Sequence, residues 1–319
     1  MPDLPDHECD LHCHTVRSDG NDTPKELIDL AASAGLKAIA ITDHDIDPPL
    51  DVEENNQIVD IKQYARSRGL RLVLGYEFSC DTDVDDVHIL GYELDWENIL
   101  LKDEVERARQ SKSDAYKELC EKLTKRGMPI YYEDEILTYI DNSGTARSRN
   151  PNDVQKKHIF ELMAKKGYAP SWDKAKLLVR DDPGLNVKRE KISPWEGISI
   201  IKKCGGLAVL AHPYLIDEIV FSGFTGEASR EEYIGWLIGC GLDGIESCYT
   251  YNKTTYKGDK TNRQIKAEIE EKYRDRVKFF TGGSDYHNDG KKGVKDPRYL
   301  GEAGISLEEF NSIFNSKAK

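Results

Sequence analysis

The stretch KAIAITDHD, residues 37–45, joins a short apolar run to a histidine flanked by two aspartates. An apolar run of this length is typical of a strand that is buried on both faces, as in a parallel sheet. Asp43 to Asp45 then lie at the carboxyl end of that strand, where parallel βα architectures gather their functional groups. The stretch therefore predicts both a fold class and the place of the chemistry.

Helix and strand patterns alternate on both sides of this stretch. Thr23-Pro24-Lys25-Glu26 is typical of a capped helix start, a polar helix is expected over about Glu54 to Gly69, and RLVLGY at residues 71–76 predicts the next strand. The pattern returns after residue 192, with helix starts at Ser193, Ser229 and Ser306 and strands at 207–210, 243–247 and 277–281. Such alternation implies parallel βα units, hence a barrel or a doubly wound sheet.

The middle of the chain has a different character. Asp103 to Gly127 is a long, highly charged helix pattern, and Gly144 to Lys191 is helix and loop with little strand signal. We therefore expect one barrel domain made of residues 1–100 and 193–319. Residues 101–192 are expected to form a helical insertion that caps the barrel and binds substrate.

The charge of the chain is unevenly distributed. The formal net charge of -13 argues against binding long nucleic acid, which requires many Lys and Arg contacts to phosphates. Residues 145–192, however, carry twelve Lys or Arg against six acidic residues. This basic block could attract a small phosphorylated substrate, or it could simply be a solvated helical surface.

Composition indicates a cytoplasmic protein. The seven cysteines include no CxxC pair, which favours reduced thiols in a reducing compartment. No apolar run is long enough to span a membrane, and residues 1–10 lack the features of a secretory signal. No membrane partner is expected, and the oligomeric state stays open.

Histidines and carboxylates recur at the ends of the predicted strands. A lone H-x-H or a lone His before Pro is more often structural, but unrelated surface histidines would not be expected to follow apolar strands so regularly. His7 lies outside this pattern. Imidazole and carboxylate ligands suit Zn, Mn and Fe, so their convergence on one rim predicts a metal site. The residues concerned are His12, His14, His44, Glu77, His88, His212, Asp285 and His287.

The ordered motifs resemble those of the PHP (polymerase and histidinol phosphatase) phosphoesterases, most closely a TrpH-like branch. Asp10-Leu11-His12-Cys13-His14-Thr15, Ser18-Asp19-Gly20 and Thr42-Asp43-His44-Asp45 are similar to the opening signature. Gly75-Tyr76-Glu77, His88-Ile89-Leu90-Gly91, Ala211-His212-Pro213, Gly241 to Glu246 and Gly283 to His287 resemble the later motifs, in the same order. The resemblance covers about two thirds of the chain and implies a distorted (β/α)7 barrel with a helical insertion.

The resemblance also implies a trinuclear centre of three divalent ions, Mn, Fe or Zn. One ion would take His12, His14, Glu77 and Asp285; a second would share Glu77 and add His88 and His212; the third would take Asp19, His44 and His287. The carboxylates of Asp10, Asp43 and Asp45 could orient ligating imidazoles.

In the insertion, Lys156-Lys157-His158-Ile159 resembles a segment that reads Arg-Pro-His-Ile in the TrpH-like branch. The resemblance implies that His158 faces the leaving group or the phosphate, and that His158 and Asp285 are the catalytic residues. Lys156 cannot make the bidentate phosphate contact of an arginine, so Arg147 or Arg149 could substitute. Arg147, Lys156 and His158 are the expected substrate-binding residues; the alternative is that these basic residues only face solvent.

The expected function is hydrolysis of a small phosphate ester by a metal-bridging hydroxide. By resemblance, the substrate is a nucleotide phosphate, such as a nucleoside 3',5'-bisphosphate or monophosphate. A cyclic phosphodiester or a histidinol-phosphate-type substrate remains an alternative within the same chemistry. A non-catalytic metal-binding regulatory module is the alternative from another class. A metal-dependent amide hydrolase is disfavoured, because no lysine occupies a matching strand end.

Overall fold

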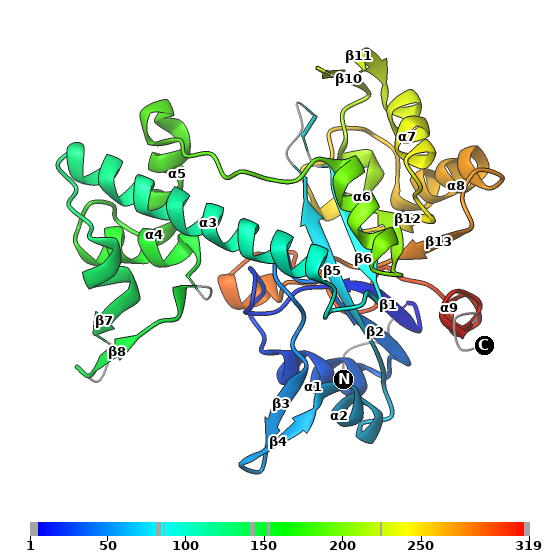
Figure 1. The fold of residues 1–319 in the computed structure, drawn as a ribbon, viewed down its shortest axis with the longest axis horizontal. Helices are drawn as coiled ribbons and strands as arrows, with labels where there is room; N and C mark the ends of the chain where they lie inside the picture. Colours follow the sequence, from blue (N-terminus) through cyan, green and yellow to red (C-terminus); the bar gives the residue numbers. More distant parts are fainter. Residues whose placement is uncertain are drawn as a thin grey trace. The chain divides into compact units, whose positions relative to one another are not determined.

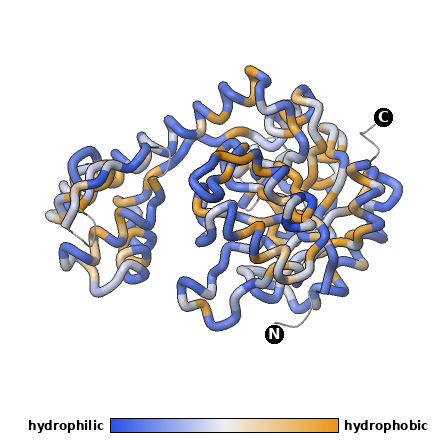
Figure 2. The backbone as a smooth tube through the Cα atoms, turned by 90° about the horizontal axis from the view of Figure 1, so that it is seen from below, coloured by the Kyte–Doolittle hydropathy of each residue, from blue (hydrophilic) through white to orange (hydrophobic). Residues whose placement is uncertain are grey.

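The computed structural model describes residues 6–80, 84–85, 87–140, 144–151, 154–223 and 225–315. The chain divides into two compact units, unit 1 with Met1–Asp103 and Ile192–Lys319, and unit 2 with Glu104–Lys191 (Figure 1). Apolar residues, in orange in Figure 2, occur along segments of both units. Each unit therefore has the means to bury a core of its own.

Seven strands of unit 1 form one sheet that is nearly closed. Beyond the last strand the chain returns to the first, where the His14 N–H donates to Tyr286 O over 2.9 Å and the Tyr286 N–H donates to His12 O over 3.2 Å. The expected distorted barrel is therefore confirmed. In sheet order the strands are β1 (Cys9–Cys13), β2 (Ala38–Ile41), β5 (Arg71–Ser79), β6 (His88–Tyr92), β9 (Leu207–Leu210), β12 (Gly244–Cys248) and β13 (Phe279–Gly282).

The expectation of purely parallel strands is wrong for one strand, β6. β6 is antiparallel to both β5 and β9, whereas the other neighbouring pairs are parallel. A parallel crossover needs about a dozen residues or more, and the connection between β5 and β6 is shorter. The reversal pairs His88, the first residue of β6, with Ser79, the last residue of β5. His88 therefore begins a strand and still lies at the carboxyl rim of the parallel strands.

Local sequence sets the helix starts of unit 1. Thr23 and Glu26 form a reciprocal capping box at α1 (Pro24–Ala34). The predicted starts at Ser193, Ser229 and Ser306 are confirmed in the same way, because each serine caps a helix whose N3 residue is glutamate. In a capping box two backbone N–H groups that lack a helical partner are both satisfied. The helices with such boxes are α6 (Pro194–Lys203), α7 (Arg230–Gly239), α8 (Asn262–Tyr273) and α9 (Leu307–Phe314).

A hairpin occupies residues where a helix was predicted. β3 (Asp51–Glu54) pairs with β4 (Gln57–Asp60), and α2 (Ile61–Ser67) begins only afterwards. Asn55 and Asn56 both have positive φ, 52° and 61°, which a two-residue hairpin turn of the primed type requires and asparagine tolerates. The prediction of a helix from Glu54 is therefore wrong for residues 54–60, and the helix begins at Ile61. A second hairpin of β10 (Ile219–Ser222) and β11 (Gly226–Ser229) was not predicted either.

Both faces of the barrel strands are buried. Ala38 and Ala40 of β2 pack in one cluster with Phe310 of α9, whereas Ile39 and Ile41 pack in a second cluster that includes residues of α1 and α2. Successive side chains of a strand point to opposite faces. Burial on both sides explains why KAIAIT is continuously apolar.

Unit 2 has a separate apolar core. It contains most of α3 (Ile99–Lys125), together with η1 (Tyr132–Leu137), α4 (Lys156–Lys165), α5 (Trp172–Asp181) and η3 (Pro183–Leu185). Leu123, Ile159, Met163 and Val179 are among its buried residues. A short hairpin of β7 (Thr138–Ile140) and β8 (Ala146–Ser148) is an addition to the expected helices and loops.

No helix within the described ranges is both long and apolar enough to cross a membrane. The seven cysteines all fall in those ranges, and none of them forms a disulfide.

Gly283 lies where the chain returns to β1, and a side chain there would collide with the backbone of His12. An added Cβ would be 2.3 Å from His12 Cβ and 2.5 Å from His12 N. We expect Gly283→Ala to lower the free energy of unfolding by about 1–3 kcal/mol, because the closed edge of the barrel has to move. Denaturant titration followed by circular dichroism measures this change.

Gly239→Ala is the matched control, because an added Cβ at the end of α7 meets no atom within 4 Å. Its stability should be unchanged or slightly increased by the better helix propensity of alanine. Equal stability of Gly283→Ala and the wild type would contradict the close approach at the closure.

Candidate metal centre

Glu77, on β5, lies at the centre of the histidine cluster. Only 1% of its surface is exposed. Both of its oxygens face imidazole nitrogens, an arrangement suited to a carboxylate that bridges two cations. Oε2 is 3.0 Å from His12 Nε2, 3.1 Å from His14 Nε2 and 3.3 Å from His44 Nδ1; Oε1 is 2.9 Å from His88 Nδ1 and 3.4 Å from His212 Nε2.

Asp285, just after β13, faces two of the same imidazoles, those of His12 and His14. Its Oδ1 is 3.1 Å from His14 Nε2 and 3.6 Å from His12 Nε2. Asp285 and His212 have positive φ angles, 53° and 29°, a strained conformation for residues other than glycine. Such strain persists only where the surroundings hold the residue in place, and it is concentrated at functional sites.

A further group surrounds Asp19 in the loop after β1. His287 Nε2 is 3.0 Å from Asp19 Oδ1, and His14 Nδ1 is 3.8 Å from the same oxygen. The His14 ring stacks on the rings of His287 and His44, with centroids 4.2 Å and 4.6 Å apart. The third predicted set of ligands, Asp19, His44 and His287, is therefore brought together, with His14 as an additional member.

The carboxylates of the centre are held ionised. Burial alone would raise the pKa of Glu77, but attraction to His44, His12 and His88 keeps that pKa well below its ordinary value. Burial likewise opposes ionisation of Asp285, and His12, His287 and Arg298 outweigh it and lower its pKa.

The surroundings shift the pKa values of the imidazoles in opposite directions. Burial, reinforced by the neighbouring imidazoles, lowers the pKa of His44 to about 4. Burial also disfavours the charged forms of His12 and His14, but the surrounding carboxylates outweigh it. They raise the pKa of His12 well above its ordinary value and that of His14 to about 10. His12 and His14 are therefore protonated at neutral pH when only the protein's own groups are present.

The donor set fits divalent metal ions. Within the described residues, the buried His212 Nδ1 has no hydrogen-bond partner, although buried polar atoms are normally satisfied. Neutral imidazole and carboxylate are the ligands that Mn, Fe and Zn prefer. Three groups have their donor atoms within 4.8 Å of one another: His14, Asp19, His44 and His287; His12, His14 and Glu77; and His44, Glu77 and His88.

Glu246, on β12, orients His12. Its Oε1 is 3.1 Å from His12 Nδ1, and its Oε2 accepts the His212 backbone N–H over 2.8 Å. A carboxylate on one ring nitrogen fixes the tautomer and leaves the other nitrogen to bind a metal. Glu246 occurs in one of the motifs at a strand end, but the sequence did not indicate this role.

Asp10 and Asp43 do not orient imidazoles as expected. Asp43 accepts from Thr15 N–H and from the hydroxyls of Thr15 and Ser18. Asp10 accepts from the N–H and hydroxyl of Ser284 and from the N–H groups of Gly301 and His12. Both carboxylates therefore hold backbone loops that carry the histidines. Asp45 accepts the Ser79 N–H, and the Ser79 hydroxyl contacts His44 Nδ1 over 3.1 Å.

Arg298 is a residue of the centre that the sequence did not indicate. Its Nη1 donates to Asp285 Oδ2, which also accepts from the Tyr249 hydroxyl over 2.7 Å. Its Nη2 is 3.3 Å from His287 Nδ1. The guanidinium therefore holds two predicted ligands, and it comes from a loop without a strand or helix pattern that could have flagged it.

Asp22 fastens the two loops that carry Asp19 and His287. It is 1% exposed and accepts from the Tyr286 hydroxyl, Asn288 Nδ2 and Lys291 Nζ over 3.0, 2.9 and 2.6 Å. Two segments more than 260 residues apart in the sequence are thereby fixed side by side.

The three predicted substrate-binding residues belong to unit 2. Lys156 begins α4, and Arg147 lies exposed on β8. His158 Nδ1 accepts the Gln155 N–H over 3.1 Å, which leaves Nε2 to carry the ring proton. Burial, then Arg149, Lys157 and Lys112, lowers the pKa of His158 to about 3. Burial, then Arg189 and Lys176, lowers the pKa of Lys156. His158 and Lys156 thus lie in a strongly cationic part of unit 2.

Comparisons with known proteins agree with this arrangement. Residues 10–146 match the family model of the PHP domain. The computed structure superimposes on a predicted metal-dependent phosphoesterase from Bifidobacterium adolescentis with a TM-score of 0.69 at 23% identity, covering 98% of this chain and 97% of that one. At this identity the likeness concerns the fold.

Three curated relatives resemble the chain in sequence. A 5'-3' exoribonuclease of Salmonella typhimurium is 28% identical over 207 residues, 64% of either chain. A 3',5'-nucleoside bisphosphate phosphatase of Chromobacterium violaceum is 26% identical over 206 residues, 64% of this chain and 66% of that protein. The chain thus spans just under two thirds of both. A phosphoribosyl 1,2-cyclic phosphate 1,2-diphosphodiesterase of Eggerthella lenta is 24% identical over 289 residues, 87% of this chain and 93% of that protein.

Metal binding should release protons. His12 and His14 have raised pKa values, about 10 for His14, and a metal ion binds only the unprotonated imidazole. We therefore expect Mn²⁺ affinity to rise between roughly pH 6 and pH 9. Calorimetric titration of metal-free protein in two buffers of different ionisation enthalpy measures the protons released. Identical heats in both buffers would show that no proton leaves.

Glu246→Gln should weaken metal binding without unfolding the protein. Glutamine keeps the shape of the side chain but removes the negative charge beside His12 Nδ1, so Mn²⁺ affinity should fall roughly 10- to 100-fold. Glu270→Gln is the matched control, because Glu270 accepts from the Ser247 hydroxyl, next to Glu246 in sequence but on the opposite side of the strand. An equal loss of Mn²⁺ affinity in both variants would mean that the effect does not depend on the contact between Glu246 and His12.

Proposed function

We propose that this chain, whose residues 10–146 belong to the PHP domain family, is a metal-dependent phosphoesterase that hydrolyses nucleotide phosphates. The observation that carries the proposal is Glu77, a buried carboxylate whose two oxygens face five imidazoles. The unpartnered Nδ1 of His212 supports it. All three curated relatives named above hydrolyse phosphate esters, according to their names.

We propose three divalent ions, Mn, Fe or Zn, for the centre. Such ions would polarise phosphoryl oxygens and lower the pKa of a water molecule, the chemistry that ester hydrolysis needs at neutral pH. The ligand sets are His12, His14, Glu77 and Asp285; Glu77, His88 and His212; and Asp19, His44 and His287, which also lie near His14.

The protein's own groups supply position and charge. Glu77 and Asp285 remain ionised because neighbouring cations lower their pKa values. Glu246 fixes the His12 ring so that Nε2 faces Glu77. Arg298 and Tyr249 hold one oxygen of Asp285, so that the other faces His12 and His14. This rigidity keeps the reacting groups in a fixed geometry.

We assign the anionic groups of the substrate to the cationic residues of unit 2, with Lys156, Arg147 and His158 as contacts. Lys156 and Lys157 occupy the first turn of α4, which has no acidic residue. Cations at the positive end of a helix are unfavourable without an anion nearby, so this arrangement suits phosphate binding. The neutral His158, with its proton on Nε2, can donate a hydrogen bond to a phosphoryl or leaving-group oxygen.

The proposed substrates include the terminal nucleotide of an RNA chain. The net charge of -13 argues against wrapping long nucleic acid, but it does not prevent binding of one terminal nucleotide. The relative from Salmonella typhimurium acts on RNA and the one from Chromobacterium violaceum on nucleoside bisphosphates, according to their names. Both substrates present a phosphorylated ribonucleotide end.

A cyclic phosphodiester is the second candidate substrate. The diphosphodiesterase of Eggerthella lenta is the relative whose alignment covers nearly the whole of this chain, unit 2 included. The same metal centre would serve both esters.

A phosphate-release assay on Mn²⁺-loaded protein tests the proposal. The panel contains adenosine 3',5'-bisphosphate, 3'- and 5'-monophosphates, a 5'-phosphorylated dinucleotide, a ribose cyclic phosphate and histidinol phosphate. We expect turnover of the nucleotide esters and loss of at least about 100-fold in His12→Ala, because a ligand and its contact to Glu77 are removed. Lys156→Ala should raise KM for the bisphosphate more than it lowers kcat.

His7→Ala provides the control, because His7 contacts Gly301 O and Cys248 Sγ and lies outside the cluster. Its activity should equal that of the wild type. Bound metal without turnover of any ester in the panel would contradict the proposal and favour a non-catalytic metal-binding module.

A further inference from the structure

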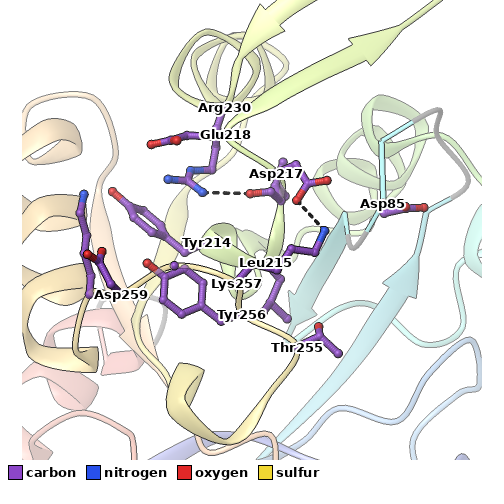
Figure 3. Close-up of a pocket in the computed structure, with 13 residues that line it drawn as sticks. Asp85, Tyr214, Leu215, Asp217, Glu218, Arg230, Thr255, Tyr256, Lys257 and Asp259 are labelled. Atoms are coloured by element: carbon purple, nitrogen blue, oxygen red, sulfur yellow. Dashed lines mark hydrogen bonds and ion pairs between the residues drawn. The ribbon is translucent and has the colours of Figure 1, made fainter.

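A second cavity in unit 1 lies outside the metal centre. It has a volume of about 310 Å³, at the lower end of the range of small-molecule pockets. Tyr214, Tyr256, Arg230 and the pair Asp217–Lys257 line it (Figure 3). These residues come from the segments that follow β9 and β12 and from the start of α7, and Asp85, between β5 and β6, also lines the cavity.

Arg230 is held in this cavity with unused hydrogen-bond donors. Its guanidinium stacks over the Tyr214 ring, 3.8 Å from the centroid, and Nη1 donates to Ile216 O over 2.9 Å. Among the described residues it has no carboxylate partner. A guanidinium has five N–H donors in a fixed fork that matches a phosphate. The stacked and anchored Arg230 is therefore preorganised to bind an anion.

Tyr256 offers an aromatic surface next to Arg230. The residue is half-buried, and its ring packs edge-to-face against Tyr251 with centroids 5.7 Å apart. Tyr214, by contrast, is 4% exposed and already carries Arg230 on its ring. An aromatic ring that lines a cavity is suited to stacking a planar ring, and every nucleobase has such a π-face.

Carboxylates line the rest of the cavity. Asp217 is paired with Lys257 over 3.1 Å, whereas Glu218 and Asp259 have no cation partner among the described residues. Asp85 also lines the cavity, and three carboxylates without a cation partner among the described residues do not suit a purely anionic ligand. They do suit the hydroxyl groups of a ribose, which carboxylates bind in other nucleotide sites.

Tyrosine contacts connect the cavity to the metal centre. Tyr214 lies two residues after His212, and its N–H donates to the Tyr251 hydroxyl over 3.3 Å. Tyr251 packs against Tyr249 with ring centroids 4.9 Å apart, and the Tyr249 hydroxyl donates to Asp285. A chain of tyrosine contacts, from Tyr249 through Tyr251 to Tyr214, therefore links the metal centre to a residue that lines the cavity.

We infer that this cavity binds a ribonucleoside monophosphate unit, with its phosphate on Arg230, its base on Tyr256 and its ribose hydroxyls on Glu218 and Asp259. The inference rests on the proposed function for the identity of the unit as part of a nucleotide substrate. The unit is either a free nucleotide or the nucleotide adjoining the one whose ester is cut.

Binding to metal-free protein tests the site without requiring turnover. Full-length protein treated with EDTA is titrated with AMP, adenosine, ribose 5-phosphate and 2'-deoxy-AMP by calorimetry. We expect Arg230→Ala to weaken AMP about 10-fold or more and to leave adenosine nearly unchanged. Tyr256→Leu should weaken AMP and adenosine about 5-fold or more and barely affect ribose 5-phosphate. Deoxy-AMP should bind more weakly than AMP.

Two matched variants control for indirect effects. Arg276 also stacks on a tyrosine, 5.6 Å from the Tyr273 ring centroid, but lies outside the cavity, so Arg276→Ala should bind AMP like the wild type. Tyr256→Phe keeps the ring and should bind AMP normally. Thermal unfolding identifies any variant that fails to fold; Arg230→Lys then replaces Arg230→Ala, and Tyr256→Met, which also lacks the ring, replaces Tyr256→Leu.

A second measurement, on Mn²⁺-loaded protein, distinguishes a free nucleotide from a nucleotide that is part of the substrate. If the unit belongs to the substrate, Tyr256→Leu raises KM for a 5'-phosphorylated dinucleotide and not for adenosine 3',5'-bisphosphate. If the unit is a free nucleotide, Tyr256→Leu weakens AMP binding by the same factor and leaves both KM values unchanged. The inference is overturned if Arg230→Ala and Tyr256→Leu bind AMP as tightly as Arg276→Ala. Loss of ester hydrolysis with intact, Tyr256-dependent AMP binding would refute the proposed function and leave the site standing.

Discussion

A buried carboxylate without partners would be too costly to keep ionised in a protein interior. Glu77 is almost fully buried, and the rest of unit 1 is arranged around its compensation by imidazoles. Those imidazoles come from β1, from the loop after β2, from β6 and from the end of β9. The barrel is the structure that brings these distant segments to one carboxylate. Where a metal ion binds, it takes over the charge balance that protonated His12 and His14 provide.

The direction of β6 is part of this arrangement. A parallel strand in its place would present its first residue at the opposite rim, away from Glu77. The antiparallel pairing with β5 and β9 instead puts His88 Nδ1 2.9 Å from Glu77 Oε1. The departure from an all-parallel barrel therefore contributes a candidate ligand directly.

Residues that bind neither metal nor substrate keep the centre in shape. Glu246 fixes a ring, Arg298 and Tyr249 hold Asp285, and Asp22 fastens the loops of Asp19 and His287. Asp10 and Asp43 act on backbone loops in place of the imidazoles that we had expected. Tyr251 contacts both Tyr249 of this network and Tyr214 of the second cavity, so packed tyrosines connect the metal centre with the inferred nucleotide site.

Local sequence was enough to predict what depends on neighbouring residues. Apolar runs determined the buried strands, and Ser and Thr with Glu three residues later determined the helix starts. The positions of His and carboxylates indicated a metal centre, and the resemblance of the ordered motifs to PHP proteins implied the barrel. The hairpin at Asn55-Asn56 was missed because turn geometry outweighed the helix pattern around it. Only the tertiary structure decided the direction of β6, the roles of Glu246 and Arg298, and the cavity beside Tyr256. These features depend on contacts between residues far apart in the chain, and no local periodicity or spacing encodes which distant side chains will meet.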